Sequence, residues 1–426
     1  MAELLSPAGL GPLGLGAMAD DPLPAAPQPR IAYLESLRGL ASVQVLLLHV
    51  CSAYLPGIAT YRDGPWSLAD AIHASPLYFL YDGYAAISVF YLLSGYVLAG
   101  AFARQFERPL QALLARVARL GLPAMAALFL SAGLYWAFGG LNGQAGAITG
   151  SKFLAGGWAP EFSLAAILKE SFDALFIGYS GVGPINGAPA WLALDQSQSY
   201  DVPLWSLSYE FYGSILVFAL CWMRAKSPGA AKVAVLLLAA SFSRGPYVLF
   251  VLGFALAWMG AGTRAPRLGA IASLGCVALG VTLCFTAERH QAPAIAAFCR
   301  LDTPWLAPCL SPIPLQRTFG AVALFIGVLQ SGALRRALAA PILRYLGKIS
   351  FPLYLVHWPL VFGVGPFALL ALAPILGPAP AQALIGLAVV ALALAGAAAF
   401  TRVDDLAMAA ARRINGFSIR TAPAAA

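Results

Sequence analysis

The chain has 426 residues, of which 60% are hydrophobic and 10% are charged. Soluble domains usually carry about 25% charged residues, so the composition excludes a soluble enzyme, a secreted disulfide scaffold and a disordered chain. The apolar runs are long and do not alternate, which also excludes a β-barrel. We therefore expect an all-α, polytopic transmembrane bundle. The net charge of +8 does not indicate nucleic acid, because basic residues of membrane proteins collect in cytoplasmic loops.

Residues 1–30 are rich in Pro, Gly and Ala, which predicts a disordered cytoplasmic tail, and residues 403–426 are expected to form a second tail. Between the tails the sequence predicts about ten spans of roughly 20 residues each. Their approximate ranges are 33–55, 77–100, 119–138, 203–223, 230–244, 245–262, 268–286, 313–331, 345–368 and 379–401. Region 171–194 is apolar but interrupted by Gly and Pro, so we interpret it as a loop or a re-entrant segment.

Ten spans place both termini on one side of the membrane. Of the 26 Lys and Arg residues, 19 fall on the side of the termini, so both termini are predicted to be cytoplasmic. We expect a multi-pass protein of the cell membrane, such as a bacterial inner membrane. No repeat of fixed period is evident, which weakens an inverted-repeat transporter. Cys299 and Cys309 flank one polar outer loop and form either a disulfide or a pair of free thiols.

The first span carries an unusual row of polar residues. Arg38 and His49 are 11 residues apart, so they share a helix face with an offset of about 20° and are separated by about 16 Å along the axis. Glu35, Ser42 and Ser52 lie close to the same line. Because ionisable groups inside a membrane are costly, this stripe is expected to face a protein-lined cavity. The simpler alternative is that His49 is a core histidine bonded to a neighbouring helix.

Two further spans carry charged residues near the membrane surfaces. Glu210 follows the start of the fourth span, with Ser206 on the same face. Its expected role is to orient or charge a histidine, or to bind an acceptor hydroxyl; the alternative is a buried carboxylate paired with Arg. Arg116 and Arg119 are i, i+3 neighbours at the start of the third span. Paired guanidiniums suit phosphate oxygens, although they are also ordinary membrane anchors.

Other polar positions occur in the ninth and second spans. Tyr354 and His357 fall mid-membrane, where a histidine needs a partner. Ser94 and Gly95 form a short turn-like motif in which glycine permits close approach of the backbone, and we assign them to the cofactor-binding side. None of the six cysteines has a histidine at metal-ligand spacing, so no metal site is expected.

Five sequence blocks resemble one known family in the same order. RIAYLESLRGLASVQVLLLHV resembles the opening motif of the acyltransferase type 3 family, with the spacing from Arg38 to His49 as its signature. The other blocks are SVFYLLSGYVL, the RxxR of Arg116 and Arg119, PLWSLSYEFYG and LGKISFPLYLVHWPL. They run from residue 31 to about 360, and the family domain is expected over 31–402.

The resemblance implies a bundle of about ten transmembrane helices that transfers an acyl group, commonly acetyl from acetyl-CoA, to a hydroxyl of a carbohydrate or lipid-linked glycan. It implies that His49 is catalytic and that Arg116 and Arg119 meet the acyl donor. The partners would be acyl-CoA, the glycan acceptor and the bilayer, with no nucleic acid and no permanently bound cofactor.

The residues suggest a mechanism in which His49 deprotonates the acceptor, with Glu210 stabilising the imidazolium and Arg38 helping to bind the donor phosphates. Glu35, Ser206, Tyr354 and His357 are expected to support this site. A covalent intermediate on Ser94 or His49 is the alternative route. Two other functional classes remain open: a transporter or flippase whose permeation path is the polar stripe, and a non-catalytic scaffold in which His49 only packs.

Overall fold

A computed structural model describes residues 32–59, 68–103, 108–180, 192–260, 268–287, 292–301 and 312–416. Within these ranges the chain is helical, with one isolated β-bridge between Tyr179 and Leu194 and no strand. The expected N-terminal tail, His290 and Cys309 lie outside the described residues. Cys299 is disulfide-bonded, whereas Cys51, Cys221, Cys276 and Cys284 are free thiols.

Helices cover each of the ten predicted apolar segments, and further short helices, such as Leu141–Thr149 and Lys152–Gly156, lie between them. They are α1 (Ala32–Tyr54), α2 (Pro56–Ala59), α3 (Leu68–His73), η2 (Pro76–Tyr81), α4 (Gly83–Phe102), α5 (Pro109–Phe138), α6 (Leu141–Thr149), α7 (Lys152–Gly156), α8 (Leu164–Phe176), η3 (Gln196–Gln198), η4 (Val202–Leu204), α9 (Trp205–Lys226), α10 (Pro228–Ser241), α11 (Tyr247–Trp258), α12 (Ala270–Thr286), α13 (Pro293–Cys299), α14 (Pro312–Gln330), α15 (Gly332–Leu338), α16 (Pro341–Lys348), α17 (Ser350–Pro359), η5 (Leu360–Val364), α18 (Gly365–Leu376) and α19 (Pro378–Gly416).

Not every predicted segment is long enough to cross a bilayer. In the described part of the chain six helices have the length and hydropathy of a span: Ala32–Tyr54, Gly83–Phe102, Pro109–Phe138, Val202–Lys226, Ser350–Leu376 and Pro378–Gly416. A seventh candidate is α14 with α15, which are bent by 93° relative to each other. Helices α10, α11 and α12 are apolar but shorter than 18 residues. The protein is thus an all-helical membrane protein, while ten crossings and cytoplasmic termini stay predictions.

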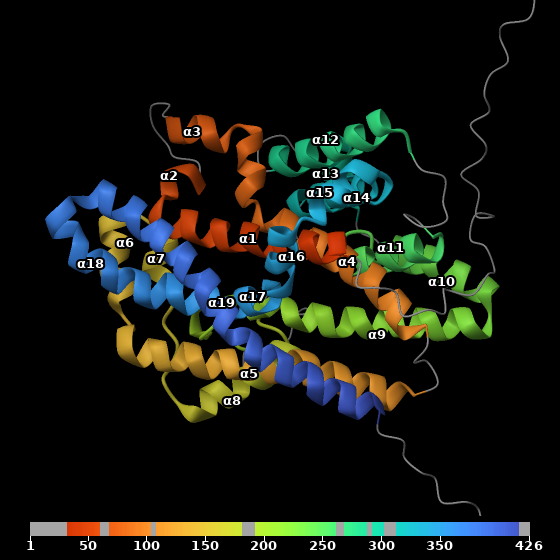
Figure 1. The fold of residues 1–426 in the computed structure, drawn as a ribbon, viewed down its shortest axis with the longest axis horizontal. Helices are drawn as coiled ribbons and strands as arrows, with labels where there is room; N and C mark the ends of the chain where they lie inside the picture. The colour runs from red at the N-terminus through yellow and green to blue at the C-terminus, as the bar shows by residue number, and fades with distance from the viewer. Residues whose placement is uncertain are drawn as a thin grey trace, which may run out of the picture.

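The C-terminal tail expected at 403–426 is not a tail throughout. Helix α19 continues to Gly416, and its 39 residues span about 58 Å, well beyond a hydrocarbon core of about 30 Å. Figure 1 shows its C-terminal end on the same side of the molecule as the first residues of α1 and α5. The extension is held in the fold because Asp404 binds Arg119 of α5.

Helix α1 lies at the centre of the bundle and packs against α4, α16, α17 and α19. Small residues let the backbones approach closely, as in many membrane bundles. A Cβ on Gly39 would lie 2.5 Å from the backbone nitrogen of Gly347, and a Cβ on Gly347 would lie 2.3 Å from the carbonyl oxygen of Glu35. This contact fixes α16, and with it the start of α17, against α1.

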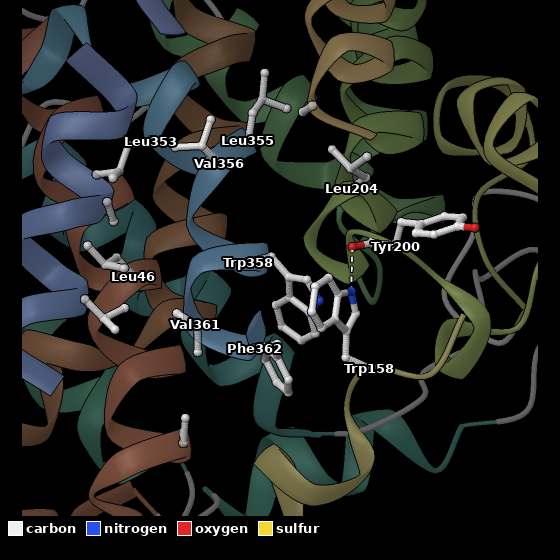
Figure 2. Close-up of a cluster of buried hydrophobic side chains, with 14 of the residues drawn as sticks. Leu46, Trp158, Tyr200, Leu204, Leu353, Leu355, Val356, Trp358, Val361 and Phe362 are labelled. Atoms are coloured by element: carbon white, nitrogen blue, oxygen red, sulfur yellow. Dashed lines mark hydrogen bonds between the residues drawn. The ribbon is translucent and has the colours of Figure 1, made fainter. Parts of the chain in front are cut away.

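A large apolar cluster joins α1 and α17 to the segment between α7 and α9. Figure 2 shows Trp358 and Phe362 lying beside Trp158, whose indole nitrogen donates to the carbonyl oxygen of Tyr200 at 2.9 Å. Within this span the π-helical turn η5 follows directly after Pro359. This cluster therefore determines where His357 and Trp358 face α1.

Candidate active site

Three arginines line one cavity of about 100 Å³ between α1, α4, α5, α9 and α17. Arg38 comes from α1, and Arg116 and Arg119 come from α5. The same cavity is lined by Glu210, Ser206 and Tyr354 and by several aromatic and apolar side chains. The sequence placed these polar residues in four separate segments, and the fold brings them together.

Glu210 has a different partner from the one predicted. Its Oε2 accepts from Arg116 at 2.9 Å, and its Oε1 accepts from the Ser94 hydroxyl at 2.7 Å. No hydrogen bond joins Glu210 to His49 in the described structure, and the expectation that Glu210 orients or charges this histidine stays a prediction. The pairing of a buried carboxylate with Arg, given as the alternative, is observed, because α9 packs against α4 and α5.

Ser94 and Gly95 serve the helix packing. Ser94 holds Glu210 and does not line the cavity. A Cβ on Gly95 would lie 2.3 Å from the carbonyl oxygen of Phe250, and one on Gly253 would lie 2.2 Å from that of Leu92. The two glycines allow α4 and α11 to touch along their backbones, so the expected assignment of Ser94 and Gly95 to cofactor binding is not supported by their position.

Arg119 is held by a carboxylate that the sequence analysis missed. Its guanidinium binds both oxygens of Asp404, with Nη2 donating to Oδ2 at 3.3 Å, and lies 5.0 Å from the ring of Phe351. Asp404 was assigned to the tail because it follows the last apolar run. The sequence signal available was the pair of acidic residues at the end of a very long helical pattern.

Arg38 differs from its two neighbours. Its guanidinium lies 4.9 Å from the Phe90 ring, and its buried Nε has no hydrogen-bond partner. No salt bridge joins it to a carboxylate within the described residues. The cavity therefore contains three guanidiniums and one carboxylate, Glu210, and its surplus positive charge suits an anionic ligand.

His49 lies outside this cavity and contacts a second histidine. Its Nδ1 is 2.8 Å from Nε2 of His357, and the two ring planes differ by 8°. Phe153 stacks on the other side at 5.8 Å, and Trp358 meets the imidazole edge-on at 5.2 Å. His49 is half-buried. His49 is thus the partner that the mid-membrane His357 was predicted to need.

The polar stripe of α1 does not face one continuous cavity. Arg38, Ser42 and Val45 line the cavity, and Val45 is the last residue of α1 that does so. Glu35 and His49 do not line it. His49 follows Val45 by four residues, about 6 Å along the helix. The periodicity correctly placed the stripe on one face, but α17 packs over the part of that face that contains His49.

Ser206 and Tyr354, from α9 and α17, both line the cavity. The Tyr354 hydroxyl is 3.0 Å from the Ser206 hydroxyl and donates to the carbonyl oxygen of Pro203. The Tyr354 and His357 rings are one helical turn apart, with centroids 6.4 Å apart. In the described part of the chain no group of His, Cys, Asp or Glu has the arrangement needed to hold a metal ion.

Comparison with known proteins identifies the kind of chemistry. The model of a family described as an acyltransferase domain, of type 3, matches residues 31–401. The O-acetyltransferase PaAT-1 of Phomopsis amygdali is 24% identical over 378 residues, which cover 78% of this chain and 73% of that protein. No solved structure matches the chain.

Proposed function

The chain belongs to the acyltransferase type 3 family and is a membrane O-acyltransferase, and we propose that it moves an acyl group, in the simplest case acetyl, from acyl-CoA to a hydroxyl of a carbohydrate or lipid-linked glycan. The proposed donor enters from the cytoplasm and the acceptor from the opposite side of the membrane, such as the periplasmic side of a bacterial inner membrane.

The arginine cavity supports a donor of this class. Acyl-CoA carries phosphate groups, and guanidiniums bind phosphate oxygens through charged hydrogen bonds. Arg116 and Arg119 are oriented by Glu210 and Asp404, while Arg38 has no such partner and is left for the ligand. A second, apolar cavity of about 360 Å³ between α4, α5 and α9 shares Arg116 and offers surface for the apolar parts of the donor.

The position of His49 supports a role as general base. It lies about 16 Å from Arg38 along α1, a distance comparable to the length of a pantetheine arm. His49 would accept the proton of the acceptor hydroxyl while the acceptor oxygen forms a bond to the thioester carbonyl carbon. The carbon–sulfur bond then breaks, and the leaving CoA thiolate takes the proton back from His49. The ester and free CoA are the products.

The observation that carries this proposal is the pairing, on one helix, of an arginine without a carboxylate and a histidine with a nitrogen free to act as a base. The test uses the full chain in lipid nanodiscs, radiolabelled acetyl-CoA and a panel of glycan acceptors. His49→Asn keeps a side-chain N–H toward His357 but lacks the basic nitrogen, so we expect transfer to fall by roughly 10²- to 10⁴-fold with donor binding unchanged.

The matched control is His73→Asn, which removes another buried histidine at a place where its ring bonds to the carbonyl oxygen of Ile58. This variant is expected to keep its transfer rate. Full transfer activity in His49→Asn would contradict the proposed mechanism, and transport of a solute without any CoA dependence would favour a transporter.

A further inference from the structure

The hydrogen bonds of His357 determine where its proton sits. Its Nδ1 is 3.0 Å from the carbonyl oxygen of Leu353 and 2.8 Å from that of Tyr354. Carbonyl oxygens only accept hydrogen bonds, so Nδ1 must carry a hydrogen to make either contact. A neutral imidazole holds one N–H. The Nε2 of neutral His357 is therefore an acceptor.

The proton of His49 follows from that of His357. Because Nε2 of His357 accepts, the 2.8 Å contact requires Nδ1 of His49 to donate. Neutral His49 then has its lone pair on Nε2. Among the described residues this Nε2 has no hydrogen-bond partner, and it is not one of the buried atoms without a partner. It is the nitrogen left open to a reacting hydroxyl.

We propose that His357 is a positioning residue that selects the tautomer of His49 in which Nε2 is the base. The inference rests on the proposed function and adds how the base is prepared. The aromatic rings of Phe153 and Trp358 hold the plane of His49, and His357 decides which of its two nitrogens is free. A carboxylate commonly fixes a catalytic histidine; here a second imidazole, fixed by main-chain carbonyls, takes that place.

The two histidines also provide positions for the acceptor's proton during acyl transfer. When Nε2 of His49 takes the acceptor proton, His49 becomes an imidazolium whose Nδ1–H still donates to His357. If that Nδ1 proton moves across to Nε2 of His357, the charge passes to His357, whose Nδ1–H continues to donate to the two carbonyl oxygens. In both arrangements each N–H between the rings has an acceptor. The proton then returns through Nε2 of His49 to the leaving thiolate.

The test compares two substitutions of His357. His357→Gln keeps an acceptor oxygen at the end of the side chain, near the position of Nε2, whereas His357→Leu removes it. Without the acceptor we expect transfer to fall by roughly 10- to 100-fold, with donor affinity unchanged. The Gln variant is expected to regain most of the lost rate. A residue that mattered only for packing would respond to side-chain volume and not to this acceptor.

The second readout is nitrogen NMR of the 15N-histidine-labelled protein. The chain contains only four histidines, so His49 is assigned by the signal that His49→Asn removes, with His73→Asn as a control for the assignment. We expect the wild-type protein to show His49 protonated on Nδ1 and unprotonated on Nε2. In His357→Leu, we expect a mixture of both tautomers.

A proton on Nε2 of His49 in the wild-type protein would overturn the inference, and this measurement does not require any variant of His357 to fold. An unchanged rate and tautomer in His357→Leu would also overturn it. These results are distinguishable from a failure of the proposed function, which would appear as full activity in His49→Asn.

Discussion

In the described residues, a buried arginine at one site and two half-buried arginines at another bind carboxylates, and the two sites differ in whether a positive charge remains without a carboxylate. Arg317 of α14 donates through Nε to Asp82 at 3.1 Å, with side-chain exposures of 2% and 0%. Tyr78 and Tyr84 close around the same guanidinium. The α5 site has Arg116 on Glu210 and Arg119 on Asp404, but it adds Arg38 and a cavity.

The two sites show how a charge that stabilises the fold differs from a charge that is available to a ligand. At Asp82 the arginine is bound by a carboxylate that also accepts from the backbone N–H of Ala85 at the start of α4. This ion pair therefore holds α14 against α4. In the cavity one guanidinium exceeds the carboxylates that bind the other two, and a buried charge without a partner is costly. A positive charge that faces a cavity and has no carboxylate partner therefore indicates a ligand site more strongly than an arginine bound to a carboxylate does.

The largest expected effect is on the free energy of unfolding, at the ion pair of Arg317 and Asp82. Arg317→Met removes the guanidinium that binds the buried carboxylate of Asp82, so we expect unfolding to become easier by about 3–5 kcal/mol, measured by thermal or denaturant unfolding in nanodiscs. The folded fraction should keep the donor affinity of the wild type. Adding Asp82→Asn removes the buried negative charge and keeps an oxygen for the N–H of Ala85, so the double variant should regain most of the stability. No loss in the single variant would refute this account.

A smaller effect is expected at Arg38, where donor affinity should fall and stability should not. Arg38→Met removes one charged donor to the proposed phosphate group, and such hydrogen bonds contribute about 1.5–3 kcal/mol. The affinity for acyl-CoA, measured by calorimetry, should fall by roughly 10- to 150-fold, while stability is unchanged or higher because a half-buried charge with no carboxylate in hydrogen-bond contact among the described residues is removed. Reduced stability with unchanged donor affinity would place Arg38 in the same class as Arg317.

A third effect, which grows with pH, is expected where a carboxylate is buried without any arginine. Both side-chain oxygens of Asp201 lack a partner, and burial, with the neighbouring charge of Glu170, holds the pKa of Asp201 well above its ordinary value. The unfolded chain therefore releases this proton first, so the wild-type protein loses stability as the pH rises above about 4, by at most about 1.4 kcal/mol per pH unit.

Asp201→Asn removes this titration, so the variant should be more stable than the wild type at pH 8 and should differ less at pH 5. Thermal unfolding at the two pH values checks the sign. Because Asp201 precedes the span that begins at Val202, the measurement also shows whether the N-terminal end of this span tolerates a charge. Greater stability of the wild type at the higher pH would contradict the prediction.

The positions of polar residues within the apolar segments predicted part of the site but not the contact between His49 and His357. Arg38, Arg116, Arg119, Glu210, Ser206 and Tyr354 do meet, as polar residues of apolar helices must when lipid is excluded from them. The contact of His49 with His357 was not predicted, because helical spacing and depth in the membrane do not show which helices are neighbours. Only the rotation and packing of α9 and α17 place His357, and not Glu210, against His49.

Composition and periodicity were sufficient for the class of the protein, because runs of apolar residues that cannot face water have few alternatives to membrane helices. Local spacing was also sufficient for which side chains share a face. Which faces meet depends on contacts between residues far apart in the chain, such as Gly95 with Phe250, Arg119 with Asp404 and His49 with His357. Those contacts are selected by the packing of the whole bundle, and no short stretch of sequence contains the shapes that select them.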